Sequence, residues 1–480
     1  MDKVVLYGAG KRCKILCHIL QYTDIEIVAI LDSNPEKWET EIEGHLVNSP
    51  ERLWDCQNIN WCITISDLNA LKSIRKQLVY TYKYKLKNEM SFNEVVLNAY
   101  KKNFKINKYI LEHKIYSGEK EAVLFDCYNG LGLGGVETWT MGICEALINA
   151  AKERVYIISD NGVYEVPSVL ENHILAININ HKEQFEITTM LNIIDVIMAK
   201  LPCKIITSTT NEVMLAAYLI KCHYPNMIKV ISVIHNSHES VYREYMEFKE
   251  CSDLYIGVSL DIKNDMVQKG ILSEKMYTMT CPFPCEKILS RNYSSIGNPI
   301  CIGYAGRMDG MEHSQKRMDL LLKLLEVLEK RNVNYKFEFA GDGEVRHDME
   351  KFVHSNNLDK RVVFLGKLKC REIAAFWKKQ DICVNMADYE GRSLSIIEAM
   401  GNGVVPVVTA TSGVREDISD GINGYIIPLG QYQIMADRIE YLAQHKDQLV
   451  KMGKLAHDGI YPKSLMEPHL NFWETILSKK

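Results

Sequence analysis

Two glutamates separated by seven residues lie in the stretch of sequence best suited to chemistry. The run 382–387 predicts a buried strand, and a helix is predicted to begin near Ser393, a residue type that often caps helices. Glu390 falls in the intervening loop, and Glu398 lies about 1.4 turns into the helix. A helix start offers free N–H groups to a diphosphate, while the carboxylates could face a sugar and a ribose. From the residues alone, a capping group and a surface glutamate remain the alternative.

Cations upstream could complete such a site. Arg307 and Lys316 fall between a predicted strand and the next predicted helix, and Arg317 is a weaker candidate. Cleavage of a sugar–phosphate bond leaves a diphosphate with new negative charge. Each charge-assisted hydrogen bond to it contributes about 1.5–3 kcal/mol. The sequence contains no Asp-x-Asp pair of the kind that holds a donor through a divalent cation, which supports a site without metal. Exposed surface charge is the alternative.

The segment 390–428 resembles the signature of the retaining glycosyltransferases of family 4. It reads Glu, seven residues, a second Glu, A-M-G-x-G-x-x-P-V-V, a Ser-Gly loop and a strand ending in G-Y-x-x-P. The likeness extends over about residues 121–480 and implies a GT-B fold and retention of anomeric configuration. It also implies that Glu390 lies against the transferred sugar, that Glu398 binds the ribose, and that Arg307 and Lys316 stabilise the leaving diphosphate. The remaining donor contacts that it implies come from Arg392, Ser393, Leu394 and Ser395.

The same resemblance implies further contacts on both sides of a cleft. The Gly-rich loop with Gly134 and Gly135 would approach the donor phosphate and the acceptor, although such a loop alone can be a simple turn. His235 would lie near the donor sugar, with His238 as its competitor. Segment 341–344 and the turn from Gly366 to Leu368 would flank the nucleobase. An acceptor hydroxyl would then attack on the face that the diphosphate leaves, and the diphosphate would take the proton.

Alternating strands and helices must position these groups. Apolar runs at 122–128, 154–160, 204–210, 229–236, 254–259 and 276–283, then 301–308, 335–343, 361–367, 382–387, 404–410 and 424–428, predict strands. Helical patterns between them indicate an α/β protein with two parallel-sheet domains facing a cleft, joined by a linker at 281–299. The expected division is 1–118, 119–295, 296–460, and a C-terminal helix at 461–480 that packs back on the acceptor-side domain.

The N-terminus predicts a third, smaller Rossmann-like domain. Gly8 and Gly10 follow a strand at 3–7, and Asp32 ends the next strand, which resembles a dinucleotide fingerprint. Cys13 replaces the third glycine. The domain is similar to small modules of bacterial polysaccharide-modifying proteins. Binding of a nicotinamide dinucleotide there and a purely structural or docking role are both open, the second being favoured.

Composition restricts the remaining classes. The 480 residues carry a formal charge of −4, which gives no reason to expect nucleic acid as a partner. The fourteen scattered cysteines contain no C-x-x-C pair and predict reduced thiols rather than zinc ligands. Neither a signal peptide nor an apolar membrane span is recognisable, so a cytoplasmic protein is expected. Between residues 68 and 118, eleven basic residues against three glutamates indicate a solvated face or a peripheral contact with anionic lipid.

The sequence therefore predicts a metal-independent, cofactor-free transferase. It would act on a nucleotide-sugar donor and a sugar or lipid-linked sugar acceptor, in surface polysaccharide or glycolipid synthesis. Competing hypotheses are an epimerase or phosphorylase of the same architecture, a nicotinamide oxidoreductase that uses the N-terminal domain, and a non-catalytic nucleotide-sugar-binding subunit.

Overall fold

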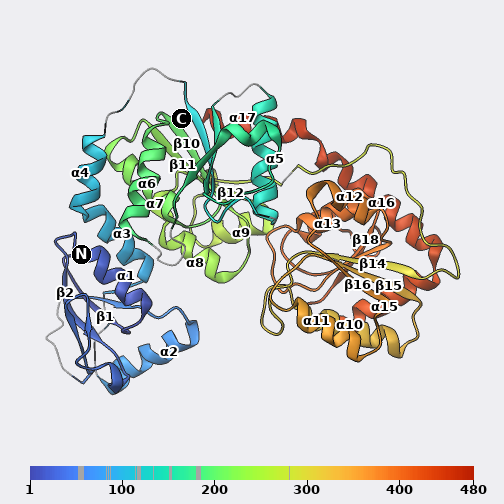
Figure 1. The fold of residues 1–480 in the computed structure, drawn as a ribbon, viewed down its shortest axis with the longest axis horizontal. Helices are drawn as coiled ribbons and strands as arrows, with labels where there is room; N and C mark the ends of the chain where they lie inside the picture. The colour runs from blue at the N-terminus through green and yellow to red at the C-terminus, as the bar shows by residue number, and fades with distance from the viewer. Residues whose placement is uncertain are drawn as a thin grey trace.

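Three parallel-dominated sheets with helical layers make up the chain (Figure 1). The computed structural model describes residues 1–51, 59–82, 84, 86, 88–113, 115, 120–132, 134–150, 154–179, 185–280 and 282–479. The sheets follow one another along the sequence, as the colour gradient of Figure 1 shows. The α/β class and the GT-B type of architecture expected from the sequence are confirmed.

The first sheet has the strand order β3-β4-β2-β1-β5-β6. Its strands are parallel apart from the antiparallel β3–β4 pair. The elements are β1 (Lys3–Tyr7), α1 (Lys11–Leu20), β2 (Glu26–Leu31), β3 (Glu41–Ile42), β4 (His45–Asn48), β5 (Asn60–Ile63), α2 (Leu68–Lys76) with a π-helical turn (Gln77–Thr81), and β6 (Glu89–Met90).

The second sheet has the order β13-β12-β11-β10-β7-β8-β9, and all its strand pairs are parallel. Its elements are β7 (Ala122–Cys127), α5 (Gly135–Asn149), β8 (Val155–Asp160), β9 (Ile174–Ile177), α6 (Ile187–Met198), β10 (Cys203–Thr207), α7 (Glu212–His223), β11 (Ile228–Ile234), α8 (Glu239–Glu247), β12 (Leu254–Gly257), α9 (Leu260–Gln268) and β13 (Met276–Thr278).

The third sheet has the order β16-β15-β14-β17-β18-β19 and is also parallel. Its elements are β14 (Ile300–Ala305), α10 (Met318–Lys330), β15 (Tyr335–Ala340), α11 (Arg346–Ser355), β16 (Val362–Gly366), α12 (Cys370–Trp377), β17 (Ile382–Asn385), α13 (Leu394–Gly401), β18 (Val405–Thr409), α14 (Val414–Asp417), β19 (Tyr425–Ile427), α15 (Tyr432–Gln444) and α16 (Lys446–Ser464).

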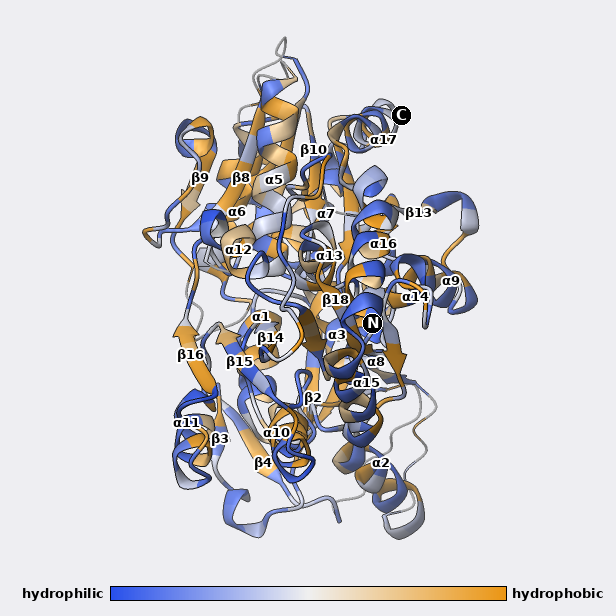
Figure 2. Cartoon of the chain, turned by 90° about the vertical axis from the view of Figure 1, so that its right-hand side faces the viewer, coloured by the Kyte–Doolittle hydropathy of each residue, from blue (hydrophilic) through white to orange (hydrophobic). Residues whose placement is uncertain are grey.

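Burial on both faces explains why the central strands read as continuous apolar runs rather than as alternating patterns. All residues of β10 and β18 are buried between helical layers. In Figure 2 the strands are hydrophobic, whereas helices such as α2 and α11 present hydrophilic residues. The carboxyl ends of the strands are consequently the places where polar loops can line a ligand cavity.

The helices α3 (Phe92–Lys102) and α4 (Phe104–Glu112) join the first two sheets into one core. Their buried residues, among them Val96, Tyr100 and Ile110, belong to the same hydrophobic cluster as Leu16 of α1 and Ile193 of α6. Several basic residues of this region are paired with carboxylates, including Arg75–Glu89, Lys101–Glu250 and Lys102–Asp2. The region is thus a structural junction, and a contact with lipid stays a prediction.

The C-terminal helix α17 (Met466–Ser478) lies against the second sheet's domain. Trp473 contacts Phe125 of β7 and Trp139 of α5, with ring centroids 5.6 and 5.8 Å apart. Lys204 also donates a hydrogen bond to the carbonyl oxygen of Leu477 (2.5 Å). The chain therefore crosses from the third domain back to the second at its end.

Some local expectations differ from the structure. The run 276–283 continues as strand only to Thr278, because Pro282 and Pro284 follow. The strand β9 is a short apolar run, Ile-Leu-Ala-Ile, that the expected set of strands did not include. Free thiols are found at the described cysteines, most of them buried. Across the part of the chain that the structure describes, helices of the length and apolarity needed to cross a bilayer are absent.

Candidate functional site

A cavity of about 530 Å³ lies between the second and third sheets and is lined by both. From the second domain it receives the start of α5 and the residues that follow β10 and β11. From the third it receives the residues that follow β14, β15 and β17 and the first turns of α13. These are carboxyl ends of parallel strands, where ligands of such sheets bind.

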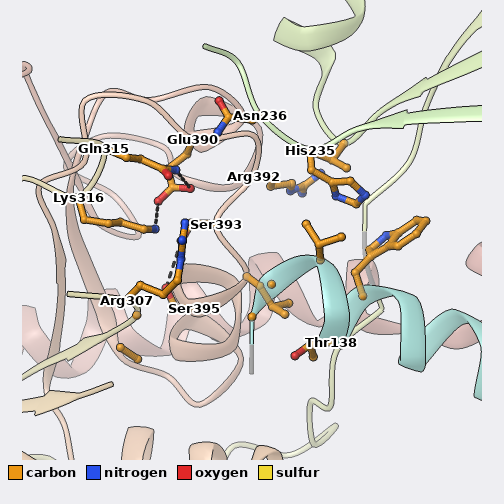
Figure 3. Close-up of a pocket in the computed structure, with 18 of the residues that line it drawn as sticks. Thr138, His235, Asn236, Arg307, Gln315, Lys316, Glu390, Arg392, Ser393 and Ser395 are labelled. Atoms are coloured by element: carbon orange, nitrogen blue, oxygen red, sulfur yellow. Dashed lines mark hydrogen bonds and ion pairs between the residues drawn. The ribbon is translucent and has the colours of Figure 1, made fainter. Parts of the chain in front are cut away.

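A buried ion pair lies on the third domain's side of the cavity. Lys316 Nζ donates to Glu390 Oε1, and their side chains are 14% and 10% exposed. Gln315 Nε2 donates to Glu390 Oε2 (3.3 Å) and to the Tyr389 carbonyl oxygen (3.2 Å). Figure 3 shows these groups gathered together. The pair brings a cation and a carboxylate, both expected from the sequence, to one wall.

Glu398 enters the cavity from α13. Burial raises the pKa of its carboxyl to about 8, and no neighbouring charge offsets the effect. None of the residues that the structure describes gives its carboxylate a hydrogen bond. Glu398 is half-buried at the cavity wall, where a ligand could provide the hydrogen-bond partners that the carboxyl lacks.

The start of α13 presents backbone rather than side-chain caps. Ser393 occupies the N-cap position but makes no capping bond; its hydroxyl lies 3.1 Å from that of Ser395. The expectation that Ser393 caps the helix is thus wrong in this detail. The helix start is left open toward the cavity, which Leu394 and Ser395 also line.

The arginines differ in how free they are. Arg392 lines the cavity, but its guanidinium is held by Asp417, with Nε–Oδ2 at 2.9 Å and Nη2–Oδ1 at 2.5 Å. Arg307 also lines the cavity, is 62% exposed and pairs with Asp309 at 2.8 Å. Arg317 pairs with Asp319 and Asp388 (3.0 Å each) and is not among the lining residues. Arg307 is therefore the arginine able to move onto a ligand.

His235 lies across the cavity from the Lys316–Glu390 pair (Figure 3). Its ring meets Trp139 edge-on, 4.8 Å between centroids, and its buried Nε2 has no hydrogen-bond partner among the described residues. Burial lowers its pKa to about 3, so the ring is neutral. His238 instead caps α8 through Ser240, and its ring packs at a tilt against that of Tyr389, with centroids 4.4 Å apart. Of the two histidines, only His235 lines the cavity.

The two domains touch around the cavity. A Cβ atom at Gly391 would lie 2.0 Å from the His235 carbonyl oxygen, so only glycine fits there. Ser237 Oγ donates to the Glu390 carbonyl oxygen (2.5 Å), and the Gly413 amide donates to Asp261 Oδ2 (2.9 Å). The loop that carries Glu390 is thereby held from the opposite domain.

Not all residues of the predicted glycine loops line the cavity. Gly134 and Gly135 line the cavity at the start of α5, where Gly134 has an extended backbone. Leu368 lines it as well, whereas Gly366, with φ +74°, ends β16 outside the lining. Gly341 lines it, and a Cβ there would lie 1.9 Å from the Gly306 carbonyl oxygen.

Sequence reasoning missed part of the lining. The missed polar residues follow β10, β11 or β13, lie on α5 or α8, or precede α10: Thr138, Ser208, Thr209, Thr210, Asn236, Glu244, Thr280 and Gln315. Runs 204–210 and 229–236, which end in polar residues, contained the signal for four of them. Glu244 had no local signal, because one glutamate in a surface-like helix pattern is ordinary.

The N-terminal candidates lie apart from the cavity and are engaged by their own chain. Asp32 Oδ2 accepts from the Ala9 amide (2.7 Å) and from Lys37 Nζ (3.0 Å), and Oδ1 accepts from the Asn34 amide (2.8 Å). Gly8 has φ +105°, and Gly10 precedes α1 without a side-chain cap. The Asp32 carboxylate thus connects the glycine loop to the end of β2.

Within the described residues, no group of three or more His, Cys, Asp or Glu side chains is arranged to hold a metal ion. Independence of metal nevertheless stays a prediction.

Comparisons with known proteins identify two segments. Residues 289–458 match the model of "Glycosyl transferases group 1", and residues 1–86 match "C2185-like, N-terminal". A poly(ribitol-phosphate) alpha-N-acetylglucosaminyltransferase of Staphylococcus aureus is 28% identical over 255 residues, 50% of this chain and 49% of the relative. An N-acetyl-alpha-D-glucosaminyl L-malate synthase of Bacillus anthracis is 28% identical over 144 residues, 30% of this chain and 37% of the relative. The chain spans about half, or less, of these curated relatives.

Solved structures extend the likeness of fold. HepE of Anabaena, in complex with UDP and glucose, superposes with a TM-score of 0.62 at 15% identity, covering 75% of this chain and all of that one. TarM of S. aureus, solved with UDP among its ligands, superposes with a TM-score of 0.51 at 13% identity, and the match covers all of both chains. The matched segment contains Lys316, Glu390 and Glu398. Residues 289–458 are therefore similar to the glycosyltransferase group 1 family, within a chain of GT-B fold.

Proposed function

We propose that this protein is a retaining, metal-independent glycosyltransferase that moves a sugar from a nucleoside-diphosphate sugar to a hydroxyl acceptor. The observation that carries the proposal is the convergence of Lys316, Glu390 and Glu398 on one cavity beside an open helix start. A cation, unpaired backbone amides and a desolvated carboxylate are the groups that a diphosphate and a ribose require.

Each residue has a distinct task. The diphosphate contacts the start of α13 and Lys316, and Arg307 closes on it from the rim. Glu398 accepts the ribose hydroxyls. Glu390, held by Lys316 and Gln315, faces the transferred sugar, with His235 opposite.

The chemistry needs no side-chain nucleophile. The acceptor oxygen bonds to the anomeric carbon on the face from which the diphosphate departs, and the diphosphate takes the acceptor proton. Charge that develops on the leaving oxygen is stabilised by Lys316 and Arg307 in an enclosed site, where such interactions are strong.

The relatives support this proposal. The Anabaena structure holds UDP and glucose, and the S. aureus relative is named for transfer of N-acetylglucosamine to poly(ribitol-phosphate). We accordingly propose a UDP-sugar donor and a role in bacterial surface polysaccharide or glycolipid synthesis. A cytoplasmic site of action, with peripheral contact at the membrane, is part of the same proposal.

The occupied carboxylate of Asp32 favours a transferase over a nicotinamide oxidoreductase. The intact group of Lys316, Glu390 and Glu398 likewise favours an enzyme over a non-catalytic subunit.

Lys316→Ala tests the proposal. Screening UDP-sugars for UDP release identifies the donor, and the variant should lower kcat by about 100-fold or more because it removes charge stabilisation in the transition state. Lys323→Ala, an exposed lysine on α10, is the matched control and should retain wild-type turnover. Turnover by Lys316→Ala at the wild-type rate would contradict the assignment.

A further inference from the structure

The two walls of the cavity differ in charge. Among its described lining residues, the lysines and arginines are Arg307, Lys316, Lys367 and Arg392, and all come from the third domain. The wall from the second domain offers hydroxyls, an amide and one carboxylate instead. An anion is therefore suited to the third domain's wall, and a neutral hydroxyl-bearing group to the other.

Ser208 is a buried hydroxyl without a partner on this second wall. It is 7% exposed, and its Oγ makes no hydrogen bond to any described residue. The loop is held by Asn211, whose Nδ2 donates to Asp126 Oδ2 (2.8 Å) and Thr209 Oγ1 (2.7 Å). A hydroxyl buried in this way in a cavity-lining residue loses its hydrogen bonds to water and gains none from the protein. A ligand hydroxyl would satisfy it.

Glu244 of α8 lies on the same wall. Thr210 Oγ1 donates to its Oε2 (3.0 Å), whereas Oε1 receives no hydrogen bond from the described residues. A carboxylate oxygen accepts only, so it selects a donor such as a hydroxyl and repels a phosphate. The helix is held from behind, since Glu247 Oε2 accepts from Asn93 Nδ2 (2.7 Å).

We propose that Ser208 and Glu244 form the acceptor subsite and bind hydroxyls of a neutral polyol or sugar unit. This inference rests on the proposed function, because it assigns the second wall to the acceptor. It also specifies the acceptor: the unit bound beside the donor is uncharged, and any phosphate of a longer acceptor lies outside this subsite.

Weak binding can be measured by saturation-transfer NMR on the full chain with UDP present. The probes are glycerol and methyl α-glucoside, with glycerol 3-phosphate as the anionic counterpart of the first. We expect the neutral probes to receive saturation more strongly than the phosphate ester. Preference for the phosphate ester, or no transfer to either neutral probe at the highest soluble concentration, would overturn the proposal.

Two variants locate the binding. Glu244→Gln should weaken neutral probes by about 10-fold, since hydrogen bonds to charged groups contribute about 1.5–3 kcal/mol, and it should also reduce the discrimination against glycerol 3-phosphate. Ser208→Ala should weaken them by several-fold without lowering the melting temperature, because it removes an unpaired buried hydroxyl. Wild-type binding of the neutral probes in both variants would refute the subsite.

Glu239→Gln is the matched control. It lies on the same helix, but its carboxylate is exposed and pairs with Lys269 at 2.8 Å. We expect it to bind the probes as the wild type does.

A UDP thermal shift of the wild type, measured separately, distinguishes the proposed function from the acceptor subsite. Absence of the shift counts against the donor site. Polyol binding that is unchanged by substitution of Ser208 and Glu244 counts against the acceptor subsite.

Discussion

Asp32, beside the N-terminal glycine loop, and Glu398, in α13, are two acidic residues with opposite surroundings. At Asp32, burial alone would raise the pKa, but the amides of Asn34 and Ala9 and the ammonium of Lys37 hold it below its ordinary value. At Glu398, burial acts without such partners and raises the pKa to about 8. The Asp32 carboxylate thus receives its hydrogen bonds from its own chain, whereas the Glu398 carboxyl receives none from the described residues.

The difference separates a structural group from a binding group better than motif resemblance does. Folding alone favours satisfied polar groups, so an enclosed carboxyl without partners persists where a ligand completes it. By this criterion we expect a structural turn at the N-terminal glycine loop and a ligand site at the start of α13. The following predictions test that contrast.

The largest effect is expected for Glu398→Gln. Loss of the Glu398 carboxyl, which the ribose hydroxyls would stabilise in its ionised form, should weaken UDP binding by about 10- to 100-fold. The variant should also change how stability depends on pH. Because the folded-state pKa is raised, the protonated Glu398 carboxyl favours folding at low pH, and this contribution is lost as pH rises from the unfolded value toward 8.

The measurements are UDP titration calorimetry and melting temperature between pH 5 and 8. The wild type without ligand should lose stability over that range more steeply than Glu398→Gln. The exposed Glu467→Gln should follow the wild type. Parallel pH profiles for wild type and Glu398→Gln would show that the carboxyl is not desolvated.

A free-energy change of comparable size is expected for Asp32→Ala, in stability rather than in ligand binding. Removal of the carboxylate leaves the Ala9 and Asn34 amides without their acceptor and should cost about 2–3 kcal/mol. Since its folded pKa is depressed, the Asp32 contribution is present above the unfolded value and lost as pH falls through the folded pKa. Urea unfolding at pH 7 checks the magnitude. A nicotinamide dinucleotide that stabilises the wild type and not the variant would instead identify Asp32 as a ligand-binding residue.

The smallest effect is expected at His235, where we predict no titration at all. Burial lowers its pKa to about 3, so its ring nitrogens should show no change in chemical shift between pH 5 and 8. Nitrogen-detected NMR of labelled histidine, assigned with His235→Asn, measures this directly. Titration near pH 6.5 would mean that the cavity is wet rather than enclosed.

The sequence predicted the sheets more completely than the contacts. Fully buried parallel strands such as β10 and β18 give long apolar runs, and those were recognised. The segment from Glu390 to Glu398 was also singled out, and both glutamates line the cavity. The ion pairs between side chains could not be predicted. Nothing in the sequence reveals that Asp417 holds Arg392 or that Lys37 holds Asp32, because these partners meet only through tertiary packing. For the same reason Glu244, on an ordinary amphipathic helix, carried no signal.

Helix α8 connects all three parts of the molecule. It contributes Glu244 to the cavity and rests on Asn93 through Glu247, while Ser237 and His238 just before it contact the loop of Glu390. Dissection by domain deletion is therefore uninformative for this chain. A fragment lacking the first hundred residues would lose most of α3, which packs on α7 and α8, and leave α8 without the support of Asn93. Inactivity of such a fragment would report damage to the remaining fold rather than the task of the missing part.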